Sequence, residues 1–268
     1  LKKWKPENYG KKFYGPSTLR VGIEKSRNLM TIRIAQNLGI DELASFSKRL
    51  NIYQDPEELL SISLGSAETT LLNLTSAYSS FVNGGKLISP IIIDRIQDSE
   101  GNTIINNENR KCSNCEKISF TGKDYPVIED NYEQIMSEQT AYQITSFLEG
   151  VIKRGTGKKL KELKLNLAGK TGTTNENTDA WFVGFTSDLV IGVYVGMDNP
   201  TPLGKFETGS KAALPIFKEF VEKAIKKSDA RPFKVPKNMT LMVIDPLTGE
   251  KAKFNSKNTI IEAYKSSN

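Results

Sequence analysis

The feature that most constrains the fold of this sequence is a run of three apolar segments separated by short polar connections. The segments read NLAGKTGT, DAWFVGFT and LVIGVYVGM. The last two are rich in β-branched and aromatic residues, and a short Ser187-Asp188 turn joins them. Connections this short join neighbouring antiparallel strands. We therefore predict an antiparallel meander over residues 166–197.

Apolar residues at helical spacing predict four helices before this meander. They are carried by SRNLMTIRIAQNLG, DELASFSKRL, TTLLNLTSAYSSFVNGG and SEQTAYQITSFLEGVIKRG. We expect Gly39 to end the first helix, Asp41 to be the N-cap of the second and Ser137 to open the fourth. The third helix is expected to turn these apolar residues inward: Leu71, Leu74, Ala77, Tyr78 and Phe81.

The sequence after the meander predicts one more helix and a hairpin. Residues 212–225 are expected to pack on the sheet through one stripe: Ala213, Ile216, Phe217, Phe220, Val221, Ala224 and Ile225. From Pro232 the stretch MTLMVIDPLTGEKAKF is expected to form a hairpin-like unit. The elements together predict an α+β fold in which helices flank a mostly antiparallel sheet.

The chain of 268 residues is long enough for one large domain. We predict a single domain over residues 1–230, with a polar surface insertion at about 106–134, and a C-terminal extension over 231–268. The stretch LISPIIIDRIQDSEGNTII before the insertion is rich in strand-forming residues, and SEGN is its expected turn. No window approaches the roughly 18 apolar residues of a membrane span. Because the chain starts at Leu1 rather than Met, we expect a processed form or a piece of a longer protein.

Histidine is absent from the sequence, which excludes Ser-His-Asp and Cys-His mechanisms and every metal site with a histidine ligand. The net charge of +6 comes from scattered lysines, so we expect a basic surface and no nucleic-acid partner. No metal or cofactor is expected. Cys112 and Cys115 have C-x-x-C spacing, but no βαβ context or second ligand pair accompanies them. They are expected to form a local disulfide or to remain idle thiols.

Two short motifs carry the residues best suited to chemistry. Lys170-Thr171-Gly172-Thr173 ends a predicted strand, where an ammonium and two hydroxyls suit a carboxylate and the glycine admits a substrate backbone. By itself this segment also fits an ordinary strand-to-turn junction. Ser26-Arg27-Asn28 by itself fits a helix N-cap. Serine-type penicillin-interacting enzymes, however, have S-x-x-K, S-x-N and K-T-G in that chain order.

Longer stretches extend this resemblance over residues 10–225. SLGSAETTLLNLTSAYSSFVNGGKLISPIIIDRI, GVIKRGTGKKL and LAGKTGTTNENTDAWFVGFTSDLVIGVYVGMDNP resemble the transpeptidase domain of class A penicillin-binding proteins. The resemblance implies a penicillin-binding transpeptidase, or serine β-lactamase-like, fold with a five-stranded antiparallel sheet between helices. It also implies acyl transfer on the D-Ala-D-Ala end of peptidoglycan stem peptides, with inhibition by β-lactams.

The same resemblance implies roles for the motif residues. Ser26 would move protons to and from the leaving amine, and Asn28 would bind the substrate amide and steady the base. Lys170 would hydrogen-bond Ser26 and supply positive potential. The strand residues would bind the terminal carboxylate (Thr171 and Thr173), form half of the oxyanion hole (the backbone N–H of Thr173) and keep the strand edge open (Gly172).

The S-x-x-K nucleophile of that family is not found before Ser26. Ser17 is followed three places later by Arg20, which cannot act as a base. The only S-x-x-K, at Ser45 to Lys48, comes after Ser26 and reads as coincidence on a surface helix. We therefore expect an upstream segment to supply the nucleophile and the isolated chain to be inactive. The family also implies a glycosyltransferase domain, a membrane anchor and a place on the periplasmic face of the bacterial inner membrane.

Two alternatives remain open. The chain is a non-acylating scaffold of cell-wall assembly under the first, and a β-lactamase or D,D-carboxypeptidase under the second. The second ranks lower, because GTGKKL and KTGTTNENTDAWFVGFT resemble the class A synthases more closely.

Overall fold

A computed structural model describes residues 4–107, 110–115, 125–226 and 231–266. Its centre is an antiparallel sheet in the order β5-β6-β7, formed by Ala168–Thr173, Ala180–Phe185 and Val190–Val195. The predicted meander is therefore confirmed. Within the described residues this sheet has three strands rather than the five that the family resemblance implied.

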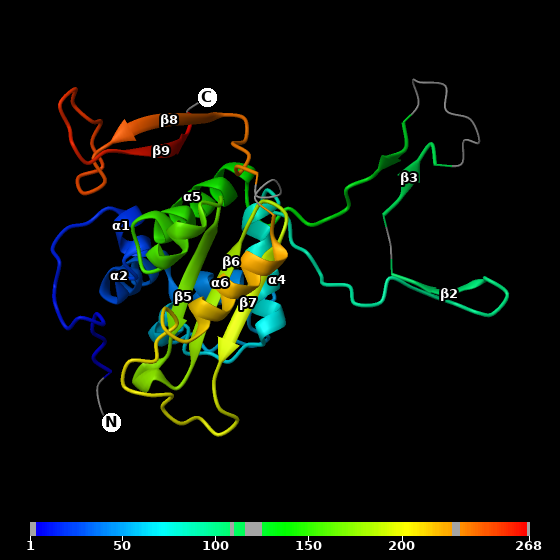
Figure 1. Cartoon of the computed structure of the whole chain (residues 1–268), viewed down its shortest axis with the longest axis horizontal. Coiled ribbons are helices and arrows are strands. Elements are labelled where there is room, and N and C mark those ends of the chain that lie inside the picture. Colours follow the sequence, from blue (N-terminus) through cyan, green and yellow to red (C-terminus); the bar gives the residue numbers. More distant parts are fainter. Residues whose placement is uncertain (1–3, 108–109, 116–124, 227–230, 267–268) are drawn as a thin grey trace.

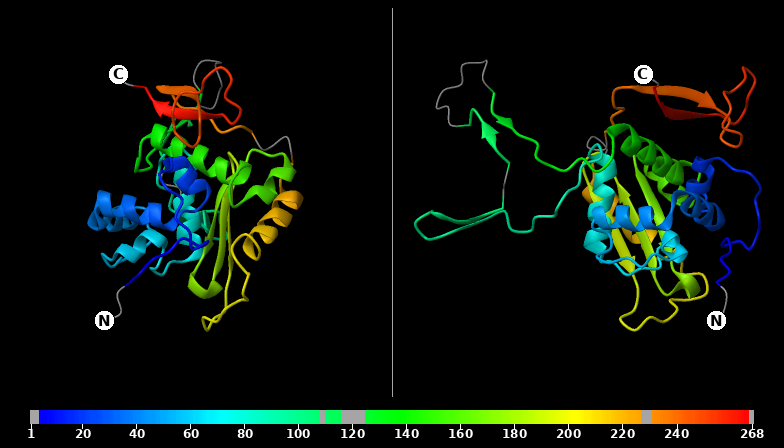
Figure 2. Two further views of the ribbon diagram at one scale, coloured as in Figure 1. Left: turned by 90° about the vertical axis from the view of Figure 1, so that its left-hand side faces the viewer. Right: turned by 180° about the vertical axis from the view of Figure 1, so that it is seen from behind.

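Helices cover both faces of this sheet (Figures 1 and 2). Successive side chains of a strand point to opposite faces of the sheet. Phe182 and Phe185 of β6 therefore lie on opposite faces. Phe182 packs on Phe217 of α6 (Ala213–Ala224), with ring centroids 4.7 Å apart. Phe185 packs in a second cluster with α5 (Glu138–Lys153) and α4 (Leu71–Val82). The sheet is thus the middle layer between α6 and the α4–α5 pair.

The predicted stripe of α6 is only partly right. Ala213, Phe217 and Val221 are fully buried as expected, and Leu214 joins them. Ile216 and Phe220 are about half exposed, and Ala224 is also exposed. The first two lie on the flank of the helix, because a step of 100° per residue turns them away from the line through Phe217 and Val221.

Short helices precede the sheet in the chain. They are α1 (Leu19–Glu24), α2 (Asn28–Leu38), α3 (Ile40–Arg49) and the 3₁₀ turn η1 (Leu60–Leu64); two further 3₁₀ turns, η2 (Lys158–Leu163) and η3 (Asn175–Asn177), flank β5. Gly39 ends α2 with a φ of 107°, as predicted. Because α3 begins at Ile40, Asp41 lies in its first turn, and the prediction that Asp41 is the N-cap is wrong.

The ends and inner faces of the longer helices follow the sequence more closely. Ser137 caps α5 by accepting a hydrogen bond from the Thr140 N–H, as expected. Ala77, Tyr78 and Phe81 of α4 pack in the core, whereas Leu71 at its first turn is exposed. The large apolar residues of α4 thus reach the core only beyond its first turn.

Two small hairpins project from the body as an arm (Figures 1 and 2). They are β1 (Arg95–Gln97) with β2 (Thr103–Asn106), and β3 (Cys112–Ser113) with β4 (Val127–Ile128). All residues of these four strands are exposed. β1 and β2 form the hairpin expected from the strand-rich stretch with its turn at SEGN, and the surface insertion at about 106–134 stays a prediction. Cys112 and Cys115 form a disulfide, which is one of the two states expected for them. Part of the predicted insertion, residues 108–109 and 116–124, lies outside the described residues.

The C-terminal hairpin differs from its prediction. β8 (Met239–Ile244) forms as expected, but its partner is β9 (Ile260–Lys265), and the predicted partner segment supplies only a bridge from Lys251 to Ile244. The hairpin lies over α5 (Figure 1), where the Gln143 side chain donates to the Ala263 carbonyl at 2.9 Å. β9 rather than the predicted segment pairs with β8, and β9 also contacts the body of the protein. A local sequence pattern does not reveal such long-range contacts. The division at residue 230 stays a prediction.

None of the helices in the described part of the chain is long and apolar enough to cross a membrane.

α1 crosses α5 at a point where only glycine fits. The Glu24 side chain is 3% exposed, and a Cβ at Gly150 of α5 would overlap its carboxylate. Close approach of the two helices therefore depends on the missing side chain at position 150.

We predict that Gly150→Ala lowers the free energy of unfolding by about 1–3 kcal/mol, because overpacking outweighs the gain in helix propensity. Urea unfolding measures this change. Lys153→Ala on the same helix removes only a surface pair with Glu149 and is expected to cost about 0.5 kcal/mol or less. Equal stability of Gly150→Ala and the native chain would contradict the prediction.

Candidate active site

The structure brings together one residue from each of the two predicted motifs. Lys170, in the middle of β5, donates a hydrogen bond from Nζ to Ser26 Oγ at 2.8 Å. The two residues are 144 positions apart in the chain. Their contact forms where the turn after α1 meets the sheet.

Ser26 sits in a tight turn between α1 and α2. Its φ of 52° is in the left-handed region, which is uncommon for a residue other than glycine. The Ser26 N–H donates to the Ile23 carbonyl at 3.1 Å, and the Arg27 N–H donates to the Gly22 carbonyl at 2.9 Å. Arg27 is the N-cap of α2 and makes no side-chain cap, so the capping alternative for Ser26 is wrong. The serine hydroxyl instead accepts the hydrogen bond from Lys170 Nζ.

Burial changes the acidity of the lysine. It lowers the pKa of Lys170 from 10.5 to about 8, because the charged ammonium loses hydration. Lys170 also donates to the Thr171 carbonyl at 2.9 Å. A lysine with this pKa is mostly charged at neutral pH, yet lies close enough to neutrality to exchange a proton. The pair can therefore supply positive potential and relay protons.

The remaining K-T-G-T residues divide between the two faces of the sheet. Lys170 and Gly172 pair with Val183 and Trp181, and strand alternation places Thr171 and Thr173 on the opposite face. The hydroxyl of Thr171 lies 2.9 Å from that of Thr156, just after α5. β5 is an edge strand of the described sheet, so its side away from β6 is not paired with another strand there.

Thr173 is held by a segment that the sequence analysis did not identify. Its hydroxyl accepts from the Gly209 N–H at 3.0 Å. A Cβ at Gly209 would overlap the carbonyl oxygens of Gly172 and Trp181, so the chain after β7 lies directly on the backbone of β5 and β6. No local signal marks Gly209. Thr156 belongs to the GTGKKL segment, which supported the family resemblance. That resemblance was the sequence signal that could have identified Thr156.

The structure does not join Asn28 to the serine–lysine pair. Its Nδ2 donates to the Glu7 carbonyl at 3.0 Å, and the neighbouring Leu29 N–H donates to the Asn8 side chain at 3.1 Å. The N-terminal segment thus lies against the start of α2. The predicted substrate contact of Asn28 stays a prediction.

The two other serines considered as nucleophiles lie elsewhere. Ser45 and Lys48 are both exposed on α3. Ser17 donates weakly to the Gly15 carbonyl, and Arg20 is almost fully buried among charged partners.

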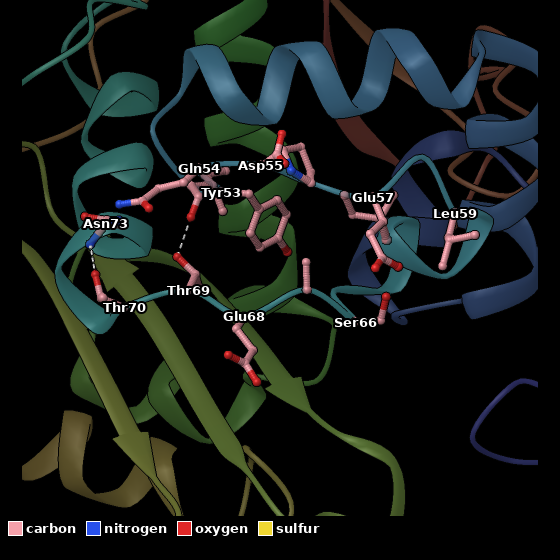
Figure 3. A pocket seen from close by; sticks show the side chains of 14 residues that line it. Tyr53, Gln54, Asp55, Glu57, Leu59, Ser66, Glu68, Thr69, Thr70 and Asn73 are labelled. Carbon is pink, nitrogen blue, oxygen red and sulfur yellow. Dashed lines mark hydrogen bonds between the residues drawn. The ribbon is translucent and has the colours of Figure 1, made fainter.

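A cavity of about 660 Å³ opens elsewhere in the molecule, between the end of α3 and the start of α4 (Figure 3). Its lining comes from residues 52–73 and includes no residue of the two motifs. The carboxylates around it, Asp55, Glu57 and Glu68, are exposed, and one side is closed by a hydrogen bond from Thr69 Oγ1 to the Ile52 carbonyl. This cavity therefore contains none of the residues for which the sequence predicted chemistry.

The lowered pKa of Lys170 gives a testable pH dependence. Between about pH 8 and pH 10.5 the unfolded chain keeps a proton that folded Lys170 has lost, so the contribution of Lys170 to native stability rises with pH in this window. Lys170→Met lacks this gain. We expect the stability of Lys170→Met relative to the native chain to fall by about 2 kcal/mol from pH 7 to pH 10, after allowance for partial exposure. Urea unfolding at several pH values checks this, and a constant difference would contradict it.

The chain is similar to known proteins over nearly its whole length. The chain is 43% identical to penicillin-binding protein 1A of Rickettsia conorii, over 99% of this chain and 33% of that protein. Penicillin-binding protein 1A of Pseudomonas aeruginosa is 33% identical, over 98% and 36%. The chain thus spans about a third of the length of the curated relatives it matches.

Solved structures share the fold. The crystal structure of penicillin-binding protein 1A from Haemophilus influenzae matches with a TM-score of 0.82 and 30% identity, covering 99% of this chain and 42% of that one. PonA1 from Mycobacterium tuberculosis in complex with penicillin V matches with a TM-score of 0.68 over 91% of this chain and 64% of that one, and its 19% identity supports the fold alone.

These likenesses confirm the predicted penicillin-binding transpeptidase fold. Residues 1–222 match the family described as the penicillin-binding protein transpeptidase domain, and the chain belongs to that family.

Proposed function

We propose that this chain is the C-terminal part of a peptidoglycan D,D-transpeptidase that cross-links D-Ala-D-Ala stem peptides through an acyl-serine intermediate. The observation that carries the proposal is the hydrogen bond from Lys170 Nζ to Ser26 Oγ, which joins the S-x-N and K-T-G segments beside an edge strand. Neither segment alone distinguishes this function from a cap or a turn. Their junction at 2.8 Å supports a shared site.

The reaction we propose has two half-reactions. A serine nucleophile outside these 268 residues attacks the D-Ala-D-Ala carbonyl, the C–N bond breaks, and D-alanine leaves. The proton that the attacking serine hydroxyl loses passes through Ser26, with Lys170 beside it, to the leaving amine. An amine of a second stem peptide then attacks the acyl-serine ester and loses a proton by the same route, which restores the serine.

The strand residues would hold the substrate during both steps. Lys170 supplies positive potential near the terminal carboxylate, and the hydroxyls of Thr171 and Thr173 bind it at the strand edge. The Thr173 N–H contributes half of the oxyanion hole, and Gly172 leaves room for the peptide backbone. Asn28 takes part once its amide exchanges the Glu7 carbonyl for the substrate amide.

The rest of the proposal concerns the longer protein. We infer that an upstream segment supplies the S-x-x-K helix, a glycosyltransferase domain and a membrane anchor, which places this domain on the periplasmic face of the bacterial inner membrane. β-Lactams inhibit by mimicking the D-Ala-D-Ala amide. The isolated chain, without the nucleophile, does not acylate.

We expect intact-mass analysis after incubation with benzylpenicillin to find one covalent adduct on the full-length gene product and none on the 268-residue chain. Peptide mapping is expected to place the adduct on the serine of an upstream S-x-x-K. An adduct on Ser45 would overturn the assignment of the motifs.

In the full-length product, Ser26→Ala is expected to slow penicillin acylation by about 10²–10⁴-fold, because it removes the proton relay. Stopped-flow or gel-based acylation with a fluorescent penicillin measures this rate. Ser45→Ala is the matched control, since Ser45 is exposed on α3, and its rate is expected to be unchanged. An equal effect of both substitutions would contradict a relay through Ser26.

One observation favours the second candidate, a non-acylating scaffold. The Asn28 side chain is bound to the Glu7 carbonyl of the N-terminal segment. Absence of any adduct on the full-length product would select this function.

A further inference from the structure

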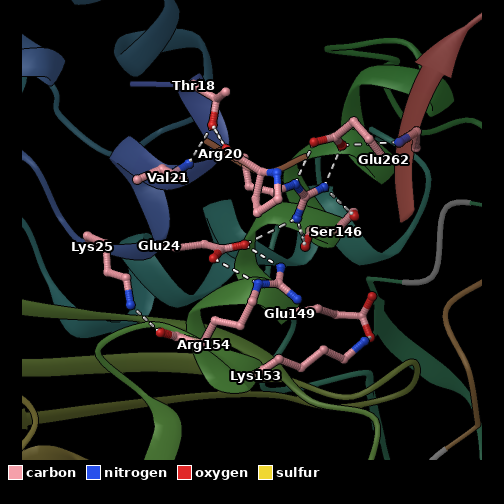
Figure 4. A network of polar contacts seen from close by, with 12 residues as sticks. Thr18, Arg20, Val21, Glu24, Lys25, Ser146, Glu149, Lys153, Arg154 and Glu262 are labelled. Carbon is pink, nitrogen blue, oxygen red and sulfur yellow. Dashed lines mark hydrogen bonds and ion pairs between the residues drawn. The ribbon is translucent and has the colours of Figure 1, made fainter. Parts of the chain in front are cut away.

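The C-terminal hairpin reaches α1 through a buried ion pair. The Glu262 carboxylate on β9 accepts from Arg20 Nε and from a terminal nitrogen of Arg20, both at 2.5 Å (Figure 4). Arg20 is 3% exposed and Glu262 7% exposed. Two parallel hydrogen bonds of this kind fix direction as well as distance. The hairpin is therefore bound to α1 in one defined orientation.

Arg20 also binds α5 and a second residue of α1. Its terminal nitrogens donate to the Ser146 carbonyl at 2.9 Å and to the Ser146 hydroxyl at 2.8 Å. One of them also lies 3.5 Å from Glu24 Oε1, four residues further along α1. The guanidinium packs over the ring of Phe147, with the carbon 4.6 Å from the ring centroid. All of the Arg20 donors thus connect the hairpin, α1 and α5.

Glu24 completes the chain of charges at the C-terminal end of α5. Its carboxylate accepts from Arg154 at 2.5 and 3.1 Å. The Glu24 carbonyl accepts from the Thr156 N–H at 3.2 Å, and Lys25 Nζ donates to the Arg154 carbonyl at 2.5 Å. Glu24 and Lys25 are the two residues directly before Ser26. The turn that carries Ser26 is therefore fastened by side-chain and backbone bonds at once.

α1 needs this support because it is short. Six residues make less than two turns, and a helix of that length is not stable without tertiary contacts. Ser26 also has an unfavourable left-handed backbone, which persists only when surrounding contacts hold it. Buried ion pairs contribute little net stability compared with apolar packing, and their better-supported role is to select one geometry.

We propose that Glu262, acting through Arg20 and Glu24, is a positioning residue that holds the Ser26 turn against Lys170, so that the β8–β9 hairpin sets the geometry of the active site. The effect of Glu262 on catalysis rests on the proposed function. The effect of Glu262 on the position of Ser26 does not, because the contact between Ser26 and Lys170 is present in this chain.

Three variants separate positioning from stability. Glu262→Gln keeps the size of the side chain but leaves Arg20 without its bidentate partner. The double variant Arg20→Met with Glu262→Leu replaces the pair by apolar residues, a change that commonly preserves or raises stability, so it decides the matter if Glu262→Gln fails to fold. Gln143→Ala is the control, because it removes a bond from α5 to β9, at Ala263, and touches no charge.

Two quantities are measured for each variant. The first is the pKa of Lys170 in the 268-residue chain, read from NMR of isotopically labelled lysine side chains, with the signal assigned by its loss in Lys170→Met. The second is the rate of penicillin acylation of the full-length product.

Loosening the Ser26 turn admits water to the ammonium. We expect the pKa of Lys170 to rise from about 8 toward 10.5 in both network variants. Misplacement of Ser26 is expected to slow acylation by about 10- to 100-fold. Gln143→Ala is expected to change neither quantity.

Two outcomes overturn the proposal. One is an unchanged Lys170 pKa in a folded Arg20→Met, Glu262→Leu chain. The other is an equal shift in Gln143→Ala, which would mean that the hairpin acts through packing alone. Failure of the wild-type full-length product to acylate would instead refute the proposed function, and the lysine measurement would still decide the positioning role.

Discussion

The antiparallel pairing of β5 with β6 is the constraint on which the rest of the molecule depends. Its register sets Lys170 opposite Val183 and Gly172 opposite Trp181, and a slip of one residue would turn every side chain to the other face. Phe182 and Phe185 keep this register because each is buried against a different helix layer. The core thus decides on which face the lysine lies.

α5 contacts both the sheet and the turn that carries Ser26. Its middle packs on β5 and β6, while its last turn and the residues after it bind Glu24 and Thr171. Gly150 allows α1 to come close enough for these bonds to form. One helix therefore connects the apolar core to a polar site at the edge of the sheet, and polar groups near Ser26 take their positions from it.

Buried charge is distributed unevenly in the molecule. Arg20, Glu24 and Glu262 are buried together and satisfy one another, whereas the ion pairs of α6 are exposed. Lys170 stands apart, because it is bound by a hydroxyl and a carbonyl rather than by a carboxylate, and burial lowers its pKa. Paired charges therefore lie beside the Ser26 turn, whereas within the described residues Lys170 donates only to neutral partners, which fits the anionic substrate of the proposed function.

Local pattern alone determined the meander, the capped start of α5 and the β1–β2 hairpin, because each follows from the spacing of apolar residues or from a cap or turn within a few positions. The two motifs were singled out by the resemblance to a family, since each alone also fits a cap or a turn. Tertiary structure decided the contacts between segments far apart in the chain: Ser26 with Lys170, Gly209 with Thr173, and β9 rather than residues 251–254 as the partner of β8. It also decided which apolar residues of α6 face the sheet, since Ile216 and Phe220 share the periodicity of the buried stripe but lie on its flank. The physical reason is common to all of these. Strand alternation and helix spacing are short-range properties of the chain, whereas burial and the capture of Glu262 by Arg20 depend on which surfaces meet once the layers have packed.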